Sequence, residues 1–276
     1  MNHGHPTDAA SSDPAARQRA ADLLWNAWQL GAAVVELPVE DRPASRADGY
    51  AIQALLAARS PGPPAGWKIA ATSEAGQRHI NVAGPLAGRL LAERVHPAGA
   101  VLSLAGNRMR VAEAEFVFRM ARDLPPRAEA YTQEETMAAV EALHLGIEVP
   151  NSRFSDYTAA GAAQLLADDA CAHDFVLGPE VVADWRRVDL AAHRVEASVV
   201  GPGREIRREG IGANVLGDPR IALVWIANEL SQHGIGLGRG ELVTTGTCVV
   251  PLEIVPGDRV EVVFGAFGRM HAQFAD

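Results

Sequence analysis

The sequence lacks the features that would place the protein in a membrane or outside the cell. Its two cysteines, Cys171 and Cys248, are too few for a disulfide framework, and a reducing compartment is the default for such a chain. No apolar run reaches the roughly 18 residues of a membrane-spanning helix. The beginning, "MNHGHPTDAASSDPAARQRAADLL", has no basic region followed by an apolar one, as a secretory signal would. We expect a soluble cytoplasmic protein in which residues 1–13 form a disordered tail.

The sequence also lacks a cluster of basic residues. The net charge of -9 and the isoelectric point near 5.5 argue against a nucleic-acid-binding surface. Walker A, His-Glu-x-x-His and Gly-x-Ser-x-Gly motifs are missing. Two glycine-rich stretches, "GIGANVLG" (210–217) and "GIGLGRG" (234–240), have the wrong glycine spacing or the wrong element order for a dinucleotide site. We interpret both as turns.

The sequence does contain enough apolar residues for a sizeable core, since they make up 48% of its 276 residues. Apolar spacing predicts helices over 14–31, 46–60, 132–144, 158–170 and 218–234, and strands over 67–72, 145–154 and most of 241–274. Thr132 and Glu135 have the spacing of a capping box. The expected class is α+β, with a helical region over 14–65 packed on a β-rich body over 66–276.

Two acidic residues stand in an apolar run, "RVAEAEFVFRM" (110–120). Strand alternation places Glu113 and Glu115 on one face, where two half-buried carboxylates repel each other. Glu148 stands in a second apolar strand-like segment. Three carboxylates suit Mg²⁺ or Mn²⁺, which prefer hard oxygen ligands. The alternative is that these acids form structural ion pairs with Arg110, Arg119 or Arg153.

Lys68 lies between apolar neighbours in "GWKIAAT". A buried lysine can transfer protons or hold an anion, whereas a lysine at a sheet edge only extends its amine to solvent. Cys171 and His173 in "DDACAHDF" could form a nucleophile and its base, or be a buried thiol and a surface imidazole. The sequence leaves both alternatives open.

Several stretches together resemble one enzyme family. They are "RPASRADGYAIQ" (42–53), "GWKIAATS" (66–73), "VAEAEFVFRMARDLP" (111–125), "GIEVPNSRF" (146–154), "LLADDACAHDFVLG" (165–178), "GDPRIALVWIANEL" (217–230) and "TTGTCVVPLEIVPGDRVEVVFGAFG" (244–268). In this order they resemble the fumarylacetoacetate hydrolase superfamily, and within it the branch of 2-keto-4-pentenoate hydratases and 4-oxalocrotonate decarboxylases. The resemblance runs from about residue 14 to the end of the sequence.

The resemblance implies a fold, a metal and a substrate class. The fold would be a mixed β-roll with a small helical N-terminal region, and the protein would form a homo-oligomer. Glu113, Glu115 and Glu148 would bind Mg²⁺ or Mn²⁺, which answers why acidic residues stand in an apolar strand. The substrate would be a small 2-oxo acid or its dienol, chelated to the metal through the C1 carboxylate and the C2 oxygen.

The resemblance also assigns residues to the substrate. Lys68 matches the family's active-site lysine, and Gly246 and Thr247 match a turn beside the substrate. The remaining positions that the resemblance places at the substrate are Arg153, Asp168, Cys171 and Leu86.

Two departures from the family pattern concern the choice of reaction. Leu86 in "GPLAG" (84–88) stands where hydratases of this branch have an acid that handles protons or water. The usual Asp-Asn-Ala-Ser pattern is replaced by Asp168, Asp169, Ala170 and Cys171, which removes an amide and a hydroxyl. The superfamily's hydrolases use a His/Glu pair, for which His79, His96 and His173 are available.

We expect a metal-dependent lyase of the 2-keto-4-pentenoate hydratase type. The alternatives are a 4-oxalocrotonate decarboxylase, favoured by the missing acid at Leu86, a C–C hydrolase, and a non-catalytic metabolite-binding subunit. Keeping Lys68 together with three glutamates speaks against the non-catalytic alternative.

Overall fold

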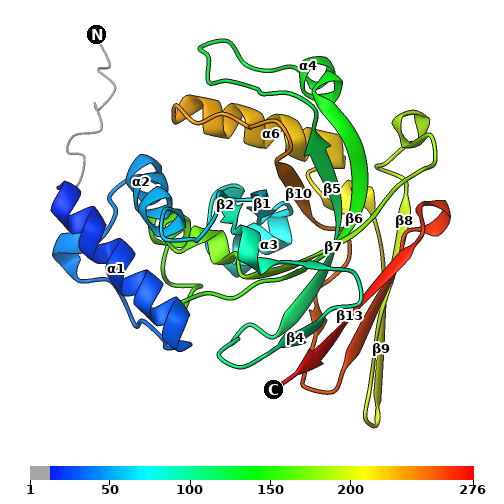
Figure 1. The fold of residues 1–276 in the computed structure, drawn as a ribbon, viewed down its shortest axis with the longest axis horizontal. Coiled ribbons are helices and arrows are strands. Elements are labelled where there is room, and N and C mark those ends of the chain that lie inside the picture. Colours follow the sequence, from blue (N-terminus) through cyan, green and yellow to red (C-terminus); the bar gives the residue numbers. More distant parts are fainter. Residues whose placement is uncertain (1–12) are drawn as a thin grey trace.

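The computed structural model describes residues 13–276 (Figure 1), so all but the last residue of the predicted tail lies outside the described residues. Helix α1 (Pro14–Leu30) begins after Asp13, whose side chain accepts a hydrogen bond from the backbone N–H of Ala15. It ends at Gly31, whose φ of 61° is a left-handed conformation that glycine adopts easily. The helix predicted over 14–31 is confirmed.

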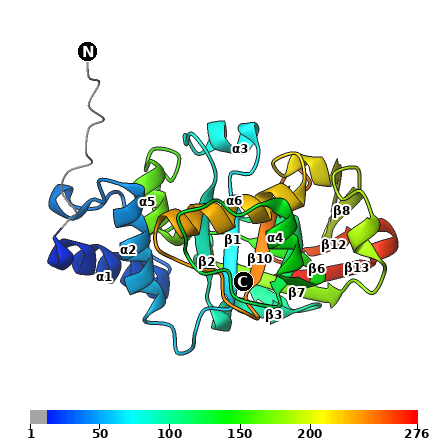
Figure 2. The same ribbon diagram turned by 90° about the horizontal axis from the view of Figure 1, so that it is seen from above.

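A second helix packs against the first, and together they form the helical region at the N-terminal side of the chain. Helix α2 (Arg46–Ala57) begins after Ser45, whose hydroxyl accepts a hydrogen bond from the N–H of Asp48. The two helices and α5 (Ala162–Ala167) lie together at one end of the molecule (Figure 2). Buried apolar side chains of these helices and of the adjoining segments form a cluster of their own, which includes Leu24, Trp28, Leu37, Ile52, Leu56 and Phe154.

The larger of two sheets carries the strands of the predicted site. Its strands are β1 (Gly66–Ala70), β2 (Leu86–Leu90), β3 (Val95–Pro97), β5 (Val111–Met120), β6 (Val140–Val149), β7 (Asp174–Glu180), β10 (Leu242–Thr247) and β11 (Leu252–Glu253). The order is β2-β1-β10-β5-β6-β7-β3, and β11 pairs with β5. Strands β5 and β6 are long, antiparallel and almost wholly buried, so their side chains face the protein interior.

The second sheet has the order β4-β13-β12-β8-β9. Its strands are β4 (Val101–Ser103), β8 (Arg194–Gly201), β9 (Arg204–Ile211), β12 (Arg259–Val263) and β13 (Arg269–Ala275). The remaining α-helices are α3 (Glu74–His79), α4 (Gln133–Ala138) and α6 (Pro219–Gln232). Helix α6 buries Leu223, Ile226 and Leu230 in the main core cluster. The predicted α+β class is confirmed.

Two predicted helices are too long. The capping box of Thr132 and Glu135 is present, but α4 ends at Ala138 and the chain then enters β6. Strand pairing with β5 buries most of this segment, and that burial outweighs the helical pattern. The helix predicted over 158–170 is only α5, which begins after Gly161 at a φ of 79°. It cannot continue through Asp169, Ala170 and Cys171, because their φ angles are 56°, 48° and 62°.

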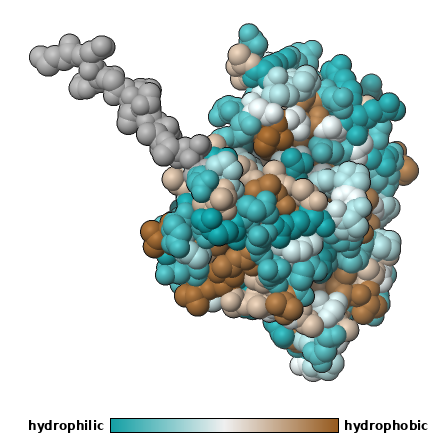
Figure 3. All heavy atoms as spheres, turned by 60° about the vertical axis from the view of Figure 1, so that its left-hand side comes forward, coloured by the Kyte–Doolittle hydropathy of each residue, from teal (hydrophilic) through white to brown (hydrophobic). Residues whose placement is uncertain are grey.

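Across residues 13–276, every helix is too short or too polar to cross a bilayer. The face shown in Figure 3 is largely hydrophilic, and its hydrophobic patches are interrupted by polar residues.

Candidate active site

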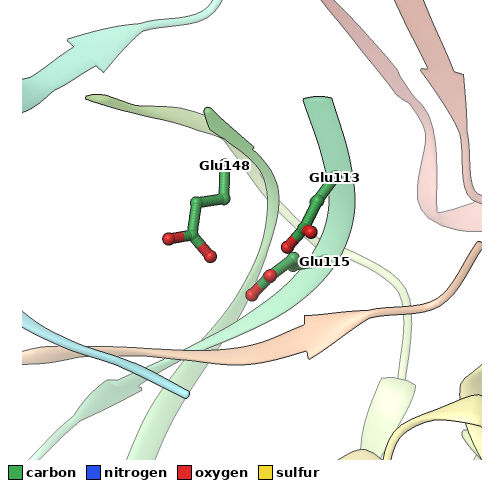
Figure 4. Close-up of side chains that lie close together, drawn as sticks. All are labelled: Glu113, Glu115 and Glu148. Atoms are coloured by element: carbon green, nitrogen blue, oxygen red, sulfur yellow. The ribbon is translucent and has the colours of Figure 1, made fainter. Parts of the chain in front are cut away.

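Strand register brings the three predicted acids together. On the antiparallel pair β5–β6, Glu113 lies directly opposite Glu148, and Glu115 lies opposite Gly146. Opposed residues point to the same face of a sheet, and Glu113 and Glu115 share that face because they are two apart. In Figure 4 the three carboxyl groups turn toward one common space.

The three carboxylates have the geometry of a cation site. One oxygen from each of Glu113, Glu115 and Glu148 lies within 4.8 Å of the others, and residues 13–276 contain no other such group of three metal-ligating side chains. Glu115 Oε2 accepts a hydrogen bond of 2.8 Å from the N–H of Gly246. Glu115 Oε1 and Glu148 Oε2 are buried without a hydrogen-bond donor among the described residues. Buried carboxylate oxygens without donors fit a hard divalent cation.

The electrostatics of the glutamate cluster favour the binding of a cation. Burial and the neighbouring charge of Glu148 raise the pKa of Glu113 to about 7, although Lys68 partly opposes this. Burial, followed by the charges of Glu148 and Glu113, raises the pKa of Glu115 well above its usual range. A divalent cation would keep these carboxylates ionised, because it replaces their mutual repulsion with attraction.

Lys68 completes the site from β1. It is the only lysine in the sequence and its exposed fraction is 2%. Its Nζ lies 2.9 Å from Glu148 Oε1 and donates a 3.0 Å hydrogen bond to the carbonyl of Ala170. Burial alone would lower the pKa of Lys68, but the charges of Glu148 and Glu113 outweigh it and the pKa is raised. The alternative of a lysine reaching solvent from a sheet edge is therefore wrong.

The predicted alternative partners of the glutamates are engaged elsewhere. Arg119 pairs with Glu141 and Glu180, and Arg153 pairs with Asp168. Arg110 donates to the backbone oxygen of Asn107. The glutamates therefore do not form the arginine ion pairs that the sequence left open, and their cationic neighbour is Lys68.

A strained loop positions the acceptor for Lys68. Asp169, Ala170 and Cys171 are all in the left-handed region, which costs a non-glycine residue about 1 kcal/mol or more. Asp168 holds one side of the loop by accepting hydrogen bonds from Ser152 Oγ and from the Arg153 backbone N–H. Asp169 Oδ1 holds the other by accepting a 2.6 Å hydrogen bond from the backbone N–H of Arg89.

Arg153 stabilises this loop by binding its backbone carbonyl groups. Its guanidinium pairs with the carboxylate of Asp168 and donates to the carbonyls of Asp168 and Ala172. The ring of Trp28 lies 4.2 Å from the Arg153 guanidinium carbon. Both members of the pair are buried and bonded to the chain itself. Substrate binding by Arg153 and Asp168 stays a prediction.

Cys171 and His173 do not form a nucleophile and its base. Burial is the main cause that raises the pKa of the Cys171 thiol to about 12, so the thiol is protonated at neutral pH. The His173 imidazole instead lies 3.4 Å from Asp174 and packs against Trp28. Of the other histidines, His96 is also bonded to Asp174, at 2.8 Å.

Of the remaining predicted residues, Gly246 and Thr247 lie beside Glu115. Gly246 has a φ of 101°, and a Cβ there would come within 2.0 Å of Thr72 Oγ1, so only glycine fits. Thr247 pairs with Glu115 across the strands, while its hydroxyl donates to the carbonyl of Val249. Leu86 is fully buried on β2, and its contact with substrate stays a prediction.

The structure joins His79, which the sequence offers as an available histidine, to Tyr157, which no sequence pattern singles out. The Tyr157 hydroxyl lies 3.2 Å from His79 Nε2, with the two rings in edge contact. Burial is the main cause that raises the pKa of Tyr157, and electrostatic interactions with Cys171, Asp156 and Glu113 raise it further. Neither residue belongs to a local motif, so their contact depends on the fold alone.

A mixed sheet with two buried glutamates, a half-buried third and a buried lysine defines a candidate site for a divalent cation. The chain belongs to the fumarylacetoacetate hydrolase family, because the family model described as "Fumarylacetoacetate (FAA) hydrolase C-terminal" matches residues 92–275. The predicted family and fold are confirmed.

Relatives within this family carry hydratase names. The chain is 32% identical over 213 residues to a 2-hydroxyhexa-2,4-dienoate hydratase of Comamonas testosteroni, covering 76% of this chain and 78% of the relative. It is 30% identical over 268 residues to a 2-keto-4-pentenoate hydratase of Paraburkholderia xenovorans, covering 95% and 96%. The fold matches that of 4-oxalocrotonate decarboxylase from Pseudomonas putida G7, solved with magnesium and adipate, with a TM-score of 0.85 at 22% identity, covering 96% of this chain and 100% of that chain.

Proposed function

We propose that the protein is a divalent-metal-dependent hydro-lyase of the 2-keto-4-pentenoate hydratase type, acting on a small 2-oxo or dienol acid. The observation that carries this proposal is the cluster of the half-buried Glu113 and the buried Glu115 and Glu148, with Lys68 beside it. The hydratase names of relatives that align over most of the chain support the reaction class.

The metal in this proposal is Mg²⁺ or Mn²⁺. When held by the three glutamates, such an ion supplies a Lewis acid that stabilises the negative charge developing on the C2 oxygen. Two solved structures with similar folds support the choice of ions. The decarboxylase was solved with magnesium. A fumarylpyruvate hydrolase from Pseudomonas aeruginosa, with a TM-score of 0.54, was solved with Mn²⁺ and pyruvate.

The chain's own residues orient the substrate and its charge. Lys68 stays charged beside Glu148 and offers N–H donors to the substrate carboxylate. Gly246 fixes the Glu115 carboxylate through its backbone N–H. In this proposal, the neutral thiol of Cys171 and the hydrocarbon side chain of Leu86 line the substrate site. They replace the polar groups that the family pattern has at these positions.

A decarboxylase of a 2-oxo-enedioate is the second candidate, and Leu86 favours it. A fully buried leucine supplies no proton to a carbon and no acceptor to a water molecule. Loss of CO₂ needs the same electron-accepting C2 oxygen but no attacking water, so it is the reaction less affected by an apolar side chain here.

Ultraviolet absorbance and mass spectrometry separate these reactions. The protein is incubated with 2-hydroxypenta-2,4-dienoate or 2-oxo-3-hexenedioate and Mg²⁺ or Mn²⁺. Gain of one water by the dienoate supports the hydratase, and loss of CO₂ from the diacid supports the decarboxylase. Cleavage of a carbon–carbon bond in an acylpyruvate would support the C–C hydrolase instead. No turnover of any of them while metal still binds would favour the non-catalytic subunit.

The assembly and location belong to the same proposal. We infer a homo-oligomer in the cytoplasm that binds a small 2-oxo acid and neither nucleic acid nor membrane, as the resemblance and the acidic composition imply. Light scattering coupled to size-exclusion chromatography would test the assembly, and a single-chain mass of 29.2 kDa would contradict it.

A further inference from the structure

A cavity apart from the glutamates is lined by α1, β3 and β4. Its volume of about 550 Å³ is within the range of cavities that bind small molecules. The lining comes from residues 27–31 at the end of α1, from β3, β4 and the segments beside them, and from residues 151, 153, 173 and 174. Of the residues that the structure describes, neither the three glutamates nor Lys68 lines it. The cavity is therefore separate from the candidate active site.

The charged groups of this lining are mostly positive. Three guanidinium groups border the cavity, from Arg94, Arg108 and Arg153, against the single carboxylate of Asp174. Arg153 is neutralised by Asp168, which does not belong to the lining. With the histidines counted as neutral, Arg94 and Arg108 against Asp174 leave an excess of positive charge. The cavity thus favours an anion, although the net charge of the chain is -9.

Arg94 retains free hydrogen-bond donors. Its Nη1 lies 3.5 Å from Asp174 Oδ1, at the upper limit of a hydrogen bond, and that oxygen is already 2.8 Å from His96 Nε2. The described residues offer the Arg94 guanidinium no other hydrogen bond, and its side chain is 30% exposed. Because a guanidinium has five N–H donors, Arg94 can bind an oxyanion in the cavity.

Arg108 carries a charge that no carboxylate compensates. Its guanidinium donates hydrogen bonds of 3.2, 3.0 and 2.9 Å to the backbone carbonyls of Gly31, Ala32 and Ser152. None of these acceptors is ionised, and Arg108 forms no ion pair with a carboxylate among residues 13–276. An anion in the cavity would therefore lie near an uncompensated positive charge.

The lining also contains unpaired polar atoms and exposed hydrocarbon. Trp28 Nε1 and His173 Nδ1 are buried without a hydrogen-bond partner among the described residues. Such unpaired groups are rare in native proteins and mark places where water or a ligand is bound. Leu30 and Val101, by contrast, expose 79% and 63% of their surface beside the cavity. Exposed apolar side chains at a pocket favour a ligand with an apolar part.

The cavity adjoins the loop that holds Lys68. Arg153 borders the cavity, pairs with Asp168 and donates a 2.8 Å hydrogen bond to the carbonyl of Ala172. Ala170 in the same loop accepts the hydrogen bond from Lys68. A molecule in the cavity would lie against the arginine that fixes this loop.

We propose that this cavity is a binding site for a small organic acid, distinct from the site of the glutamates. The oxyanion lies at the guanidinium groups of Arg94 and Arg108, since guanidinium groups bind carboxylates through several N–H donors. The hydrocarbon part lies against Leu30 and Val101. This site does not depend on the reaction proposed for the glutamates.

Titration of hexanoate into the metal-free protein tests the site, followed by nuclear magnetic resonance of the indole N–H groups of the five tryptophans. Metal is removed on a chelating resin, because a dissolved chelator is itself a carboxylate anion. The Trp28 signal, identified by its absence in Trp28→Phe, should shift with saturation. The signal of Trp185, which packs against Phe118, should not shift. An unchanged Trp28 signal would overturn the proposal.

Two further probes separate the charge of the ligand from its hydrocarbon. Inorganic phosphate should bind at least about tenfold more weakly than hexanoate, because it has no apolar part to bury. Hexylammonium has the same chain length and the opposite charge, and it should not bind. Equal binding of phosphate would show a site for the oxyanion alone, and equal binding of hexylammonium a site for hydrocarbon alone. Either result would overturn the proposal.

Variants at the cavity locate the probe. Arg94→Gln should weaken hexanoate binding at least about tenfold, since it removes a charge-assisted hydrogen bond. Val101→Asp leaves Arg94 in place and should weaken binding by repulsion. The matched control is Val200→Asp, at a valine of the same sheet that is 54% exposed, and it should bind hexanoate like the wild type. Wild-type affinity in a folded Arg94→Gln or Val101→Asp would overturn the proposal.

A variant at the glutamates separates the two sites. Glu115→Gln should bind hexanoate with wild-type affinity, because Glu115 does not line the cavity. Altered affinity there would place the probe at the glutamates and overturn the proposal. A protein that binds hexanoate at Trp28 but hydrates no dienol acid would contradict the proposed function alone.

Discussion

The Nζ of Lys68 lies 2.9 Å from Oε1 of Glu148, and both side chains are almost fully buried. This ion pair lies beside two further carboxylates, so its single positive charge offsets part of a cluster that carries up to three negative ones. A divalent cation adds the charge that the lysine alone does not supply. Metal binding at this site depends on this balance of charge.

Replacing Lys68 should separate turnover from metal binding. In Lys68→Met we expect activity to be lost while Mn²⁺ still binds, because all three carboxylate ligands remain. Without metal, the variant should be destabilised by about 3 kcal/mol, since it leaves Glu148 buried and unpaired. Urea unfolding with and without Mn²⁺ measures this. Unchanged kcat would contradict the assigned role of Lys68.

The sole lysine gives a second check on the same ion pair. An amine reagent can modify only Lys68 and the N-terminus, so mass spectrometry of the Lys68 peptide reports on this one side chain. We expect slow labelling in the native protein, because the ammonium is buried and its pKa is raised. Labelling at the rate of an unfolded chain would show that Lys68 is not buried beside Glu148.

Stability of the metal-free protein should fall as the pH rises. The pKa of Glu113 is raised to about 7 in the folded protein from an ordinary 4.5. Its favourable contribution is therefore complete below pH 4.5, is lost between pH 4.5 and 7, and does not change further above that window. For Glu113 alone the loss is about 3 kcal/mol. Urea unfolding in a chelator at pH 5 and pH 8 measures the difference.

A second buried acid requires a control in this experiment. Burial is the main cause that raises the pKa of Asp169 to about 7 as well, and Asp169 is not a metal ligand. Glu113→Gln should therefore remove only part of the pH dependence, and saturating Mg²⁺ should remove a similar part from the wild type. An identical slope in Glu113→Gln and in the wild type would contradict the electrostatic picture of the cluster.

The pair Arg153–Asp168 should hold the loop that carries Ala170. We expect Asp168→Asn to destabilise the protein by about 3 to 5 kcal/mol, because the Arg153 guanidinium would stay buried without its carboxylate. The control is Asp184→Asn, which breaks an exposed pair with Arg187 and should cost less than about 1 kcal/mol. Equal stability of the two variants would show that the buried pair does not fix the loop.

The sequence made the acidic cluster predictable because strand alternation alone places Glu113 and Glu115 on one face. It did not reveal that Glu148 lies opposite Glu113, since strand register is a tertiary property. The ion pair of Lys68, the three left-handed residues at 169–171 and the contact of Tyr157 with His79 also join segments that are distant in sequence. Local patterns do not encode such contacts.

The errors in helix length have a related cause. Residues 140–144 have a helical pattern, yet they continue as a strand because β5 offers a buried partner along their whole length. Residues 168–170 have helical neighbours, but hydrogen bonds to the side chains of Asp168 and Asp169 hold the loop in another conformation. In both places tertiary contacts outweigh local propensity.

Titration of Mn²⁺ into Glu115→Gln tests the central claim most directly. Glu141→Gln is the matched control, because Glu141 is an exposed acid on β6 that pairs with Arg119. Electron paramagnetic resonance should show one bound Mn²⁺ per chain in the wild type and in the control, and at least about 100-fold weaker binding in a folded Glu115→Gln. Wild-type affinity in Glu115→Gln would contradict the glutamate site.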